Sequence, residues 1–88
     1  MVEKKIIVLN KFGLHARPCS LLVKAASKFR SDFKIQKDNM TINGKSIMGV
    51  MMLAAECGSQ LNLIVDGVDE DEAILEIEKL FINKFEEE

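Results

Sequence analysis

Apolar residues alternate with polar ones, or gather in short β-branched runs, in four places along the chain. Such patterns are typical of strands that bury one face. They predict strands over Val2–Leu9, Asp32–Lys37, Met40–Ile42 and Leu61–Val65. Because only a short turn separates the middle two strands, we expect them to form a hairpin.

The segment between the first two strands has helical periodicity. Pro18 lacks an N–H and is tolerated only in a first helical turn, so a helix is predicted from about Ala16 to Arg30, with His15 just outside it. Residues at helical spacing form its expected core face: Cys19, Leu22, Val23, Ala26 and Phe29.

Two further helices follow from capping and spacing. Ser46 is suited to cap a short helix from Ile47 to about Leu53. Asp69 and Glu72 resemble a capping box at the start of a last helix. The expected apolar face of that last helix consists of Ala73, Ile74, Ile77, Leu80, Phe81 and Phe85.

The predicted order β-α-β-β-α-β-α is that of a two-layer α+β sandwich, in which helices cover one face of a four-stranded sheet. The pattern alone does not distinguish the strand order from a ferredoxin-like arrangement. Eighty-eight residues without a repeat or linker predict one domain spanning residues 1–88.

Composition narrows the functional classes. The chain is 48% apolar and 30% charged, as in an ordinary globular protein, and its net charge of −2 argues against general nucleic-acid binding. No apolar run approaches the roughly 20 residues that span a membrane. We therefore expect a monomeric cytoplasmic protein without membrane insertion. The glutamates at positions 86–88 are most simply interpreted as a solubilising terminus.

The two cysteines, Cys19 and Cys57, lack metal-ligand spacing. We expect them to be reduced thiols in the core. No cluster of metal ligands is apparent, so neither a metal nor a cofactor is predicted.

The chemistry centres on the only histidine of the chain. His15 directly precedes a helix whose first N–H groups have no helical partner and whose dipole favours anions. That field also favours a neutral, nucleophilic imidazole. The amides of Ala16 and Arg17 can contact phosphate, and the Arg17 guanidinium can pair with its oxygens. A lone histidine is usually a solvated loop residue, but this combination suggests phosphoryl transfer through a phosphohistidine.

The outer face of the same helix is basic and in line with His15: Arg17, Ser20, Leu21, Lys24 and Lys28. An ordinary solvated face is the alternative, but an exposed leucine beside these charges favours a docking surface for acidic partners. The short second helix has more apolar residues than one face can bury. Some of Ile47, Met48 and Met51 should therefore form an adaptable contact patch.

Three stretches carry a family resemblance: GLHARP at residues 13–18, ASKF at residues 26–29 and NGKSIMGVMML at residues 43–53. With them the chain resembles, over nearly its whole length, the HPr family of histidine-containing phosphocarriers of the bacterial sugar phosphotransferase system. The resemblance implies an antiparallel sheet of order 1-4-2-3 with three helices on one face. It also implies that enzyme I, charged by phosphoenolpyruvate, phosphorylates His15 on Nδ1, and that the group then passes to the IIA domain of a sugar permease. Such a protein is a carrier and not a stand-alone enzyme.

Ser46 has a second expected role. In HPr proteins of the Firmicutes type, the serine that matches Ser46 in the segment Lys45–Gly49 is phosphorylated by HPr kinase/phosphorylase. The resemblance implies that this modification inhibits His15 phosphorylation and promotes a complex with the repressor CcpA. The default role of Ser46 is the helix cap.

Three positions depart from the usual pattern of the family. Phe12 occupies a site that is commonly small or polar, Met52 one that often carries a small hydroxyl residue, and Ala54 one that is often glycine. None removes a group expected to touch phosphate. Phe12 and Met52 are instead expected to alter partner contacts.

Alternative functions remain open. A nitrogen-branch paralogue would retain His15 but use a different enzyme I. A purely regulatory relative such as Crh lacks the histidine, so His15 argues against it. A ferredoxin-like module for metal or RNA should show a CxxC loop or aromatic residues on the sheet, and this chain has no CxxC, tyrosine or tryptophan.

Overall fold

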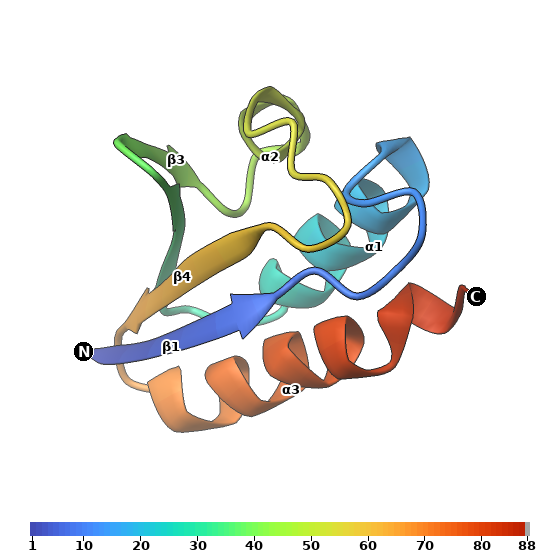
Figure 1. Ribbon diagram of the computed structural model, residues 1–88. Helices are drawn as coiled ribbons and strands as arrows, with labels where there is room; N and C mark the ends of the chain where they lie inside the picture. The colour runs from blue at the N-terminus through green and yellow to red at the C-terminus, as the bar shows by residue number, and fades with distance from the viewer. Residues whose placement is uncertain (88) are drawn as a thin grey trace.

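The computed structural model describes residues 1–87 and shows a four-stranded antiparallel sheet (Figure 1). The strands are β1 (Val2–Ile7), β2 (Asp32–Lys37), β3 (Met40–Asn43) and β4 (Gln60–Asp66), arranged in the order β1-β4-β2-β3. β2 and β3 form the predicted hairpin, with Lys37 opposite Met40. This order confirms the one implied by the HPr resemblance.

Three helices cover one face of this sheet: α1 (Ala16–Ala26), α2 (Ile47–Met52) and α3 (Glu70–Ile82) (Figure 1). Alternation along the strands explains this layering, because successive side chains point to opposite faces. On β4, Leu61, Leu63 and Val65 are buried, whereas Gln60 and Asn62 are not. The two-layer α+β sandwich is therefore the observed fold.

The core lies between the sheet and the helices. Ile35 and Leu63 from the sheet are fully buried with Leu22 of α1 and Ile77 of α3. Each such side chain contributes about 1.5–3 kcal/mol through burial. Val23 and Phe29, which were predicted to face the core, pack against it while remaining partly exposed.

α1 ends at Ala26 and not at Arg30, so the predicted length was wrong. The chain must turn to enter β2 at Asp32, and tertiary hydrogen bonds stabilise that turn. The Asp69 carboxylate accepts hydrogen bonds from the amides of Arg30 and Ser31, at 2.9 and 3.0 Å. The Lys45 ammonium donates to the Phe29 carbonyl at 2.8 Å.

The start of α3 also differs from the predicted capping box. Asp69 occupies the N-cap position but makes no side-chain capping bond, because its carboxylate is used by the turn before β2. Glu70 instead accepts a hydrogen bond from the Gly67 amide at 3.1 Å.

After α3, a short 3-10 turn, η1 (Lys84–Glu86), changes the direction of the chain. All three of its residues have left-handed backbone angles, with φ between 53° and 61°. This turn buries Phe85 completely and places its ring edge-on to Phe81, with centroids 4.9 Å apart. Phe85 thus belongs to the core as predicted, although it lies outside the helix.

Two smaller expectations were wrong. β1 ends at Ile7, two residues before Leu9, although the Val8 amide still donates to the Ser59 carbonyl at 2.9 Å. Cys57 is an exposed thiol and only Cys19 lies in the core. Within residues 1–87, no helix combines the length and apolar character needed to cross a membrane.

Candidate functional site

His15 occupies the N-cap position of α1, as predicted, and its side chain is 40% exposed. The first helical hydrogen bond runs from the Cys19 amide to the His15 carbonyl at 3.1 Å. The amide groups of Ala16 and Arg17 precede this bond, so they belong to the helix end that attracts anions. The first turn contains no acidic side chain that would occupy this end.

The loop that carries His15 is fixed by its own hydrogen bonds. The Leu14 amide donates to the Ala55 carbonyl at 2.9 Å, and the Asn10 side-chain amide donates to the Gly13 carbonyl at 2.6 Å. Gly13 has φ of 66°, and a Cβ atom at this position would lie 2.3 Å from the Ala55 oxygen. The backbone geometry before His15 therefore requires glycine.

The end of the described chain folds back onto His15, so the interpretation of Glu87 as part of a solubilising terminus was wrong. The Glu87 carboxylate oxygens lie 2.9 and 3.1 Å from His15 Nε2. Asn10 Nδ2 donates to Glu87 Oε1 at 3.0 Å. Arg17 Nη1 donates to the Phe85 carbonyl at 3.0 Å and to Glu87 Oε2 at 3.3 Å. Sequence reasoning missed Glu87, because its contacts join residues 70 or more positions apart.

The carboxylate of Glu87 is ionised in this arrangement. Partial burial raises the pKa of the Glu87 carboxyl, but hydrogen bonds from His15, Asn10 and Arg17 outweigh that effect and lower the pKa overall. The site thus combines an imidazole, a guanidinium and a carboxylate at one helix end. The contacts of Arg17 within residues 1–87 involve Nη1, which leaves the N–H groups of Nε and Nη2 for other acceptors.

The aromatic side chain of Phe12 lies beside His15. Its ring is edge-on to that of His15, with centroids 6.1 Å apart, and the side chain is 70% exposed. The Lys11 ammonium lies 5.5 Å from the centroid of the same ring. The residue that departs from the family pattern at position 12 therefore lies next to the predicted phosphoryl acceptor.

The predicted docking residues fall into two groups. Ser20, Lys24 and Lys28 are exposed, whereas Leu21 is partly buried and packs against the core, contrary to expectation. The second group, here called the α2 patch, consists of exposed apolar residues from one helix: Ile47, Met48, Met51 and Met52. Met52, not included in the predicted patch, is 65% exposed.

Ser46 caps α2 as predicted, since its hydroxyl oxygen accepts from the Gly49 amide at 3.1 Å. Its side chain is partly exposed. Ala54, the third departure from the family pattern, has φ of 48° and is exposed. A left-handed backbone explains why glycine is frequent at this position.

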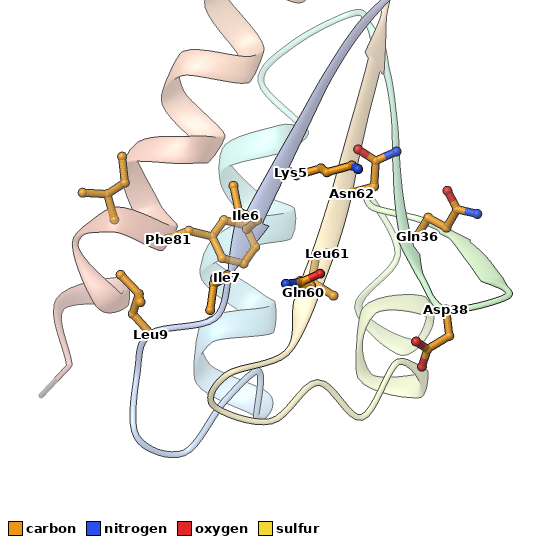
Figure 2. A pocket seen from close by; sticks show the side chains of 11 residues that line it. Lys5, Ile6, Ile7, Leu9, Gln36, Asp38, Gln60, Leu61, Asn62 and Phe81 are labelled. Carbon is orange, nitrogen blue, oxygen red and sulfur yellow. The ribbon is translucent and has the colours of Figure 1, made fainter.

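A hollow of about 690 Å³ lies away from this site (Figure 2). Lys5, Asn62 and Gln36 line it from β1, β4 and β2, and apolar residues including Leu9 and Phe81 line it on the side towards α3 (Figure 2). None of the predicted site residues lines it. Among residues 1–87 no three His, Cys, Asp or Glu side chains are grouped so that they could hold a metal ion.

Comparison with known proteins identifies the family. The family model described as "PTS HPr component phosphorylation site" matches residues 2–83. The chain belongs to the HPr family. Relatives named as phosphocarriers match it over their full length: this chain is 56% identical to the "Phosphocarrier protein HPr" of Treponema pallidum (strain Nichols) over 88 residues, which cover both chains completely.

Solved HPr structures agree with this assignment. A structure of HPr from Thermoanaerobacter tengcongensis superimposes with a TM-score of 0.97 at 48% identity, covering 100% of this chain and 99% of the other. "HPr-like protein Crh" of Bacillus subtilis (strain 168) is 47% identical over 74 residues, which cover 84% of this chain and 87% of Crh. A Crh structure described as a swapped, intertwined dimer has a TM-score of 0.77 at 42% identity, covering 96% and 97% of the two chains.

Proposed function

We propose that this chain accepts a phosphoryl group from enzyme I on Nδ1 of His15 and passes it to the IIA domain of a sugar permease. The proposal places the protein in the cytoplasm as one monomeric domain spanning residues 1–88. The observation that carries it is the position of His15, partly exposed at the start of α1 beside Arg17, in a chain of the HPr family.

This geometry suits a carrier. A carrier must hold phosphate long enough to travel and still release it, and a shallow site at a helix end provides moderate stabilisation. The amides of Ala16 and Arg17 and the free N–H groups of the Arg17 guanidinium would hold the phosphoryl oxygens. Enzyme I and IIA would complete the environment of the transition state.

The direct test uses purified protein, enzyme I and phosphoenolpyruvate. We expect one acid-labile phosphate per chain, mapped to His15, and none in His15→Ala. We expect Arg17→Ala to accept phosphate at least tenfold more slowly, because a charge-assisted partner is lost. Phosphate at any other residue, or none in the wild type, would contradict the proposal. Repeating the assay with a nitrogen-branch enzyme I distinguishes that paralogue by its faster transfer.

The exposed residues of the two helices near His15 are proposed to dock the partners. Lys24 and Lys28 would meet acidic surfaces, and the α2 patch would make the apolar contact, as flexible methionines suit several partners in turn. Phe12, beside the His15 ring, would tune the choice among them. The contact residues proposed from the sequence are Phe12, Ser20, Lys24, Lys28, Ile47, Met48 and Met51. The exposed Met52 joins them, and the partly buried Leu21 is left out. Light scattering tests the monomer, since a Crh structure shows that relatives can swap segments.

We further propose that HPr kinase/phosphorylase modifies Ser46. The likeness to Crh, described as a catabolite repression protein, supports a regulatory role. We propose that this role includes a complex with the repressor CcpA. Phosphate would add roughly two negative charges beside the α2 patch and repel an acidic enzyme I. We expect kinase and ATP to label the wild type and not Ser46→Ala. Ser46→Asp should slow His15 phosphorylation, and an unchanged rate would remove the inhibitory role.

A further inference from the structure

The contact between Glu87 and His15 is more than a loose surface ion pair. Both carboxylate oxygens lie within 3.1 Å of Nε2, and the Glu87 side chain is only 16% exposed. Asn10, itself 1% exposed, donates to one of these oxygens at 3.0 Å. The fully buried Phe85 anchors the chain two residues earlier. The carboxylate is thus held in place from several directions.

This arrangement determines which ring nitrogen carries hydrogen. An ionised carboxylate has no hydrogen and can only accept, so the hydrogen in the contact belongs to Nε2 of His15. A neutral imidazole carries a single N–H hydrogen. When that hydrogen is on Nε2, the nucleophilic lone pair is on Nδ1.

We propose that Glu87 is a positioning residue for phosphoryl transfer, which holds the His15 ring with its hydrogen on Nε2 and presents the Nδ1 lone pair to the incoming group. The inference rests on the proposed function, because it concerns the same histidine. In the step, Nδ1 forms a bond to phosphorus while the bond between phosphorus and the donor's leaving atom breaks, and that atom keeps the electron pair. Nε2 retains its hydrogen throughout.

Charge provides a second contribution from the same residue. As the bond between Nδ1 and phosphorus forms, the ring gains positive charge, and a carboxylate already fixed at Nε2 stabilises that charge. The phosphoryl oxygens are themselves anionic, but two features limit repulsion. Nδ1 and Nε2 point to different sides of the ring, and Arg17 Nη1 lies 3.3 Å from Glu87 Oε2, where it offsets the negative charge.

The tautomer can be measured without any phosphoryl transfer. Long-range proton–nitrogen NMR correlations of the His15 ring, recorded on isotope-labelled protein at a pH where the ring is neutral, report which nitrogen is protonated. We expect the wild type to show hydrogen on Nε2 alone. Glu87→Ala should shift the ring towards a mixture, whereas Glu87→Gln should keep the wild-type tautomer, since the amide oxygen still accepts from Nε2.

Transfer rates then test the role in the reaction. With enzyme I and phosphoenolpyruvate, we expect Glu87→Ala to accept phosphate on the order of tenfold more slowly than wild type. Glu87→Gln, which keeps the orientation but loses the charge, should lie between the two. Glu86→Ala removes an exposed neighbouring carboxylate and should match wild type in both measurements.

Each other outcome overturns the inference. A mixed tautomer in the wild type, or one unaffected by Glu87→Ala, shows that the carboxylate does not orient the ring. An equal or faster transfer in Glu87→Ala shows that the carboxylate has no assisting role or acts as a block. If the wild type accepts no phosphate at all, the proposed function fails, and the NMR measurement still decides the orientation separately.

Discussion

At the residue scale, Asp69 links the start of α3 to the turn before β2. Its carboxylate accepts hydrogen bonds from the Ser31 hydroxyl and from the amides of Arg30 and Ser31. The Ser31 hydroxyl is the largest influence that lowers the pKa of Asp69 from 3.8 to about 2, followed by the Arg30 amide. The ionised form is therefore favoured by folding.

The sign of the resulting pH dependence follows from that shift. Because the pKa is lower in the folded state, the stabilisation is complete above the unfolded value near 3.8 and is lost as the pH falls through about 2. We expect Asp69→Asn to unfold at lower urea than wild type at pH 7, with the difference shrinking between about pH 4 and pH 2. Urea unfolding at several pH values measures this. Asp71 is an exposed aspartate in the first turn of α3, and Asp71→Asn should not change the stability in this pH-dependent way. An equal loss of stability in both variants would refute the stabilising role of Asp69.

The two thiols should react very differently. Cys19 is fully buried and donates to the Leu14 carbonyl at 3.2 Å, and burial raises the pKa of its thiol. Cys57 is exposed. Since only thiolates react and access is required, iodoacetamide should modify Cys57 in the native protein and Cys19 only after unfolding. Mass spectrometry of Cys57→Ser should show almost no labelling without denaturant. Rapid labelling of that variant would mean that α1 opens readily.

At the element scale, local patterns predicted most of the sheet. Alternation placed β2 at its observed bounds, and the short turn after Lys37 indicated the hairpin with β3. The N-cap positions of His15 and Ser46 followed from Pro18 and from side-chain chemistry. These features depend on neighbours within a few residues.

The misses share a different cause. α1 ends at Ala26 because the chain turns there, and this turn is held by the carboxylate of a distant residue. Asp69 accepts hydrogen bonds from the amides of Arg30 and Ser31, which lie 39 and 38 positions before it. Glu87 reaches the site because η1 turns Phe85 into the core. Nothing in a window of ten or twenty residues reports such long-range partners. The acidic segment at residues 86–88 therefore had the composition of a solvated tail, although Glu87 belongs to the site.

The η1 segment should depend on its single aromatic anchor. Phe85 is fully buried against Phe81, so Phe85→Ala is expected to lower the free energy of unfolding by about 3–5 kcal/mol. Phe85→Leu should cost less than about 1.5 kcal/mol, because it keeps most of the volume. Chemical denaturation measures both. Phe12→Ala, at a residue 70% exposed, serves as the control, with an expected effect within about 0.5 kcal/mol. Equal losses at positions 12 and 85 would contradict the anchoring role.

At the scale of the whole molecule, the small net charge of −2 hides an uneven distribution. α1 contains Arg17 and Lys24 without any acidic residue, and Lys28 follows in the next turn. α3 begins with three consecutive acidic residues, Glu70 to Glu72. A partner with an acidic docking surface would therefore be attracted to the α1 side and repelled from the start of α3.

Association rates with enzyme I should reveal this asymmetry. Reversing two charges towards the C-terminal end of α1, in Lys24→Glu with Lys28→Glu, is expected to lower the association rate about tenfold at low salt and to flatten its dependence on ionic strength. Stopped-flow mixing over a salt series measures both quantities. The matched control, Lys34→Glu with Lys79→Glu, reverses two exposed lysines on β2 and α3 and so makes the same change in net charge. Both control positions lie outside α1. If the control variant loses as much association rate as the Lys24/Lys28 variant, net charge controls the association and a basic docking face does not. Retention of the wild-type salt dependence in the α1 variant would place the docking surface elsewhere on the molecule.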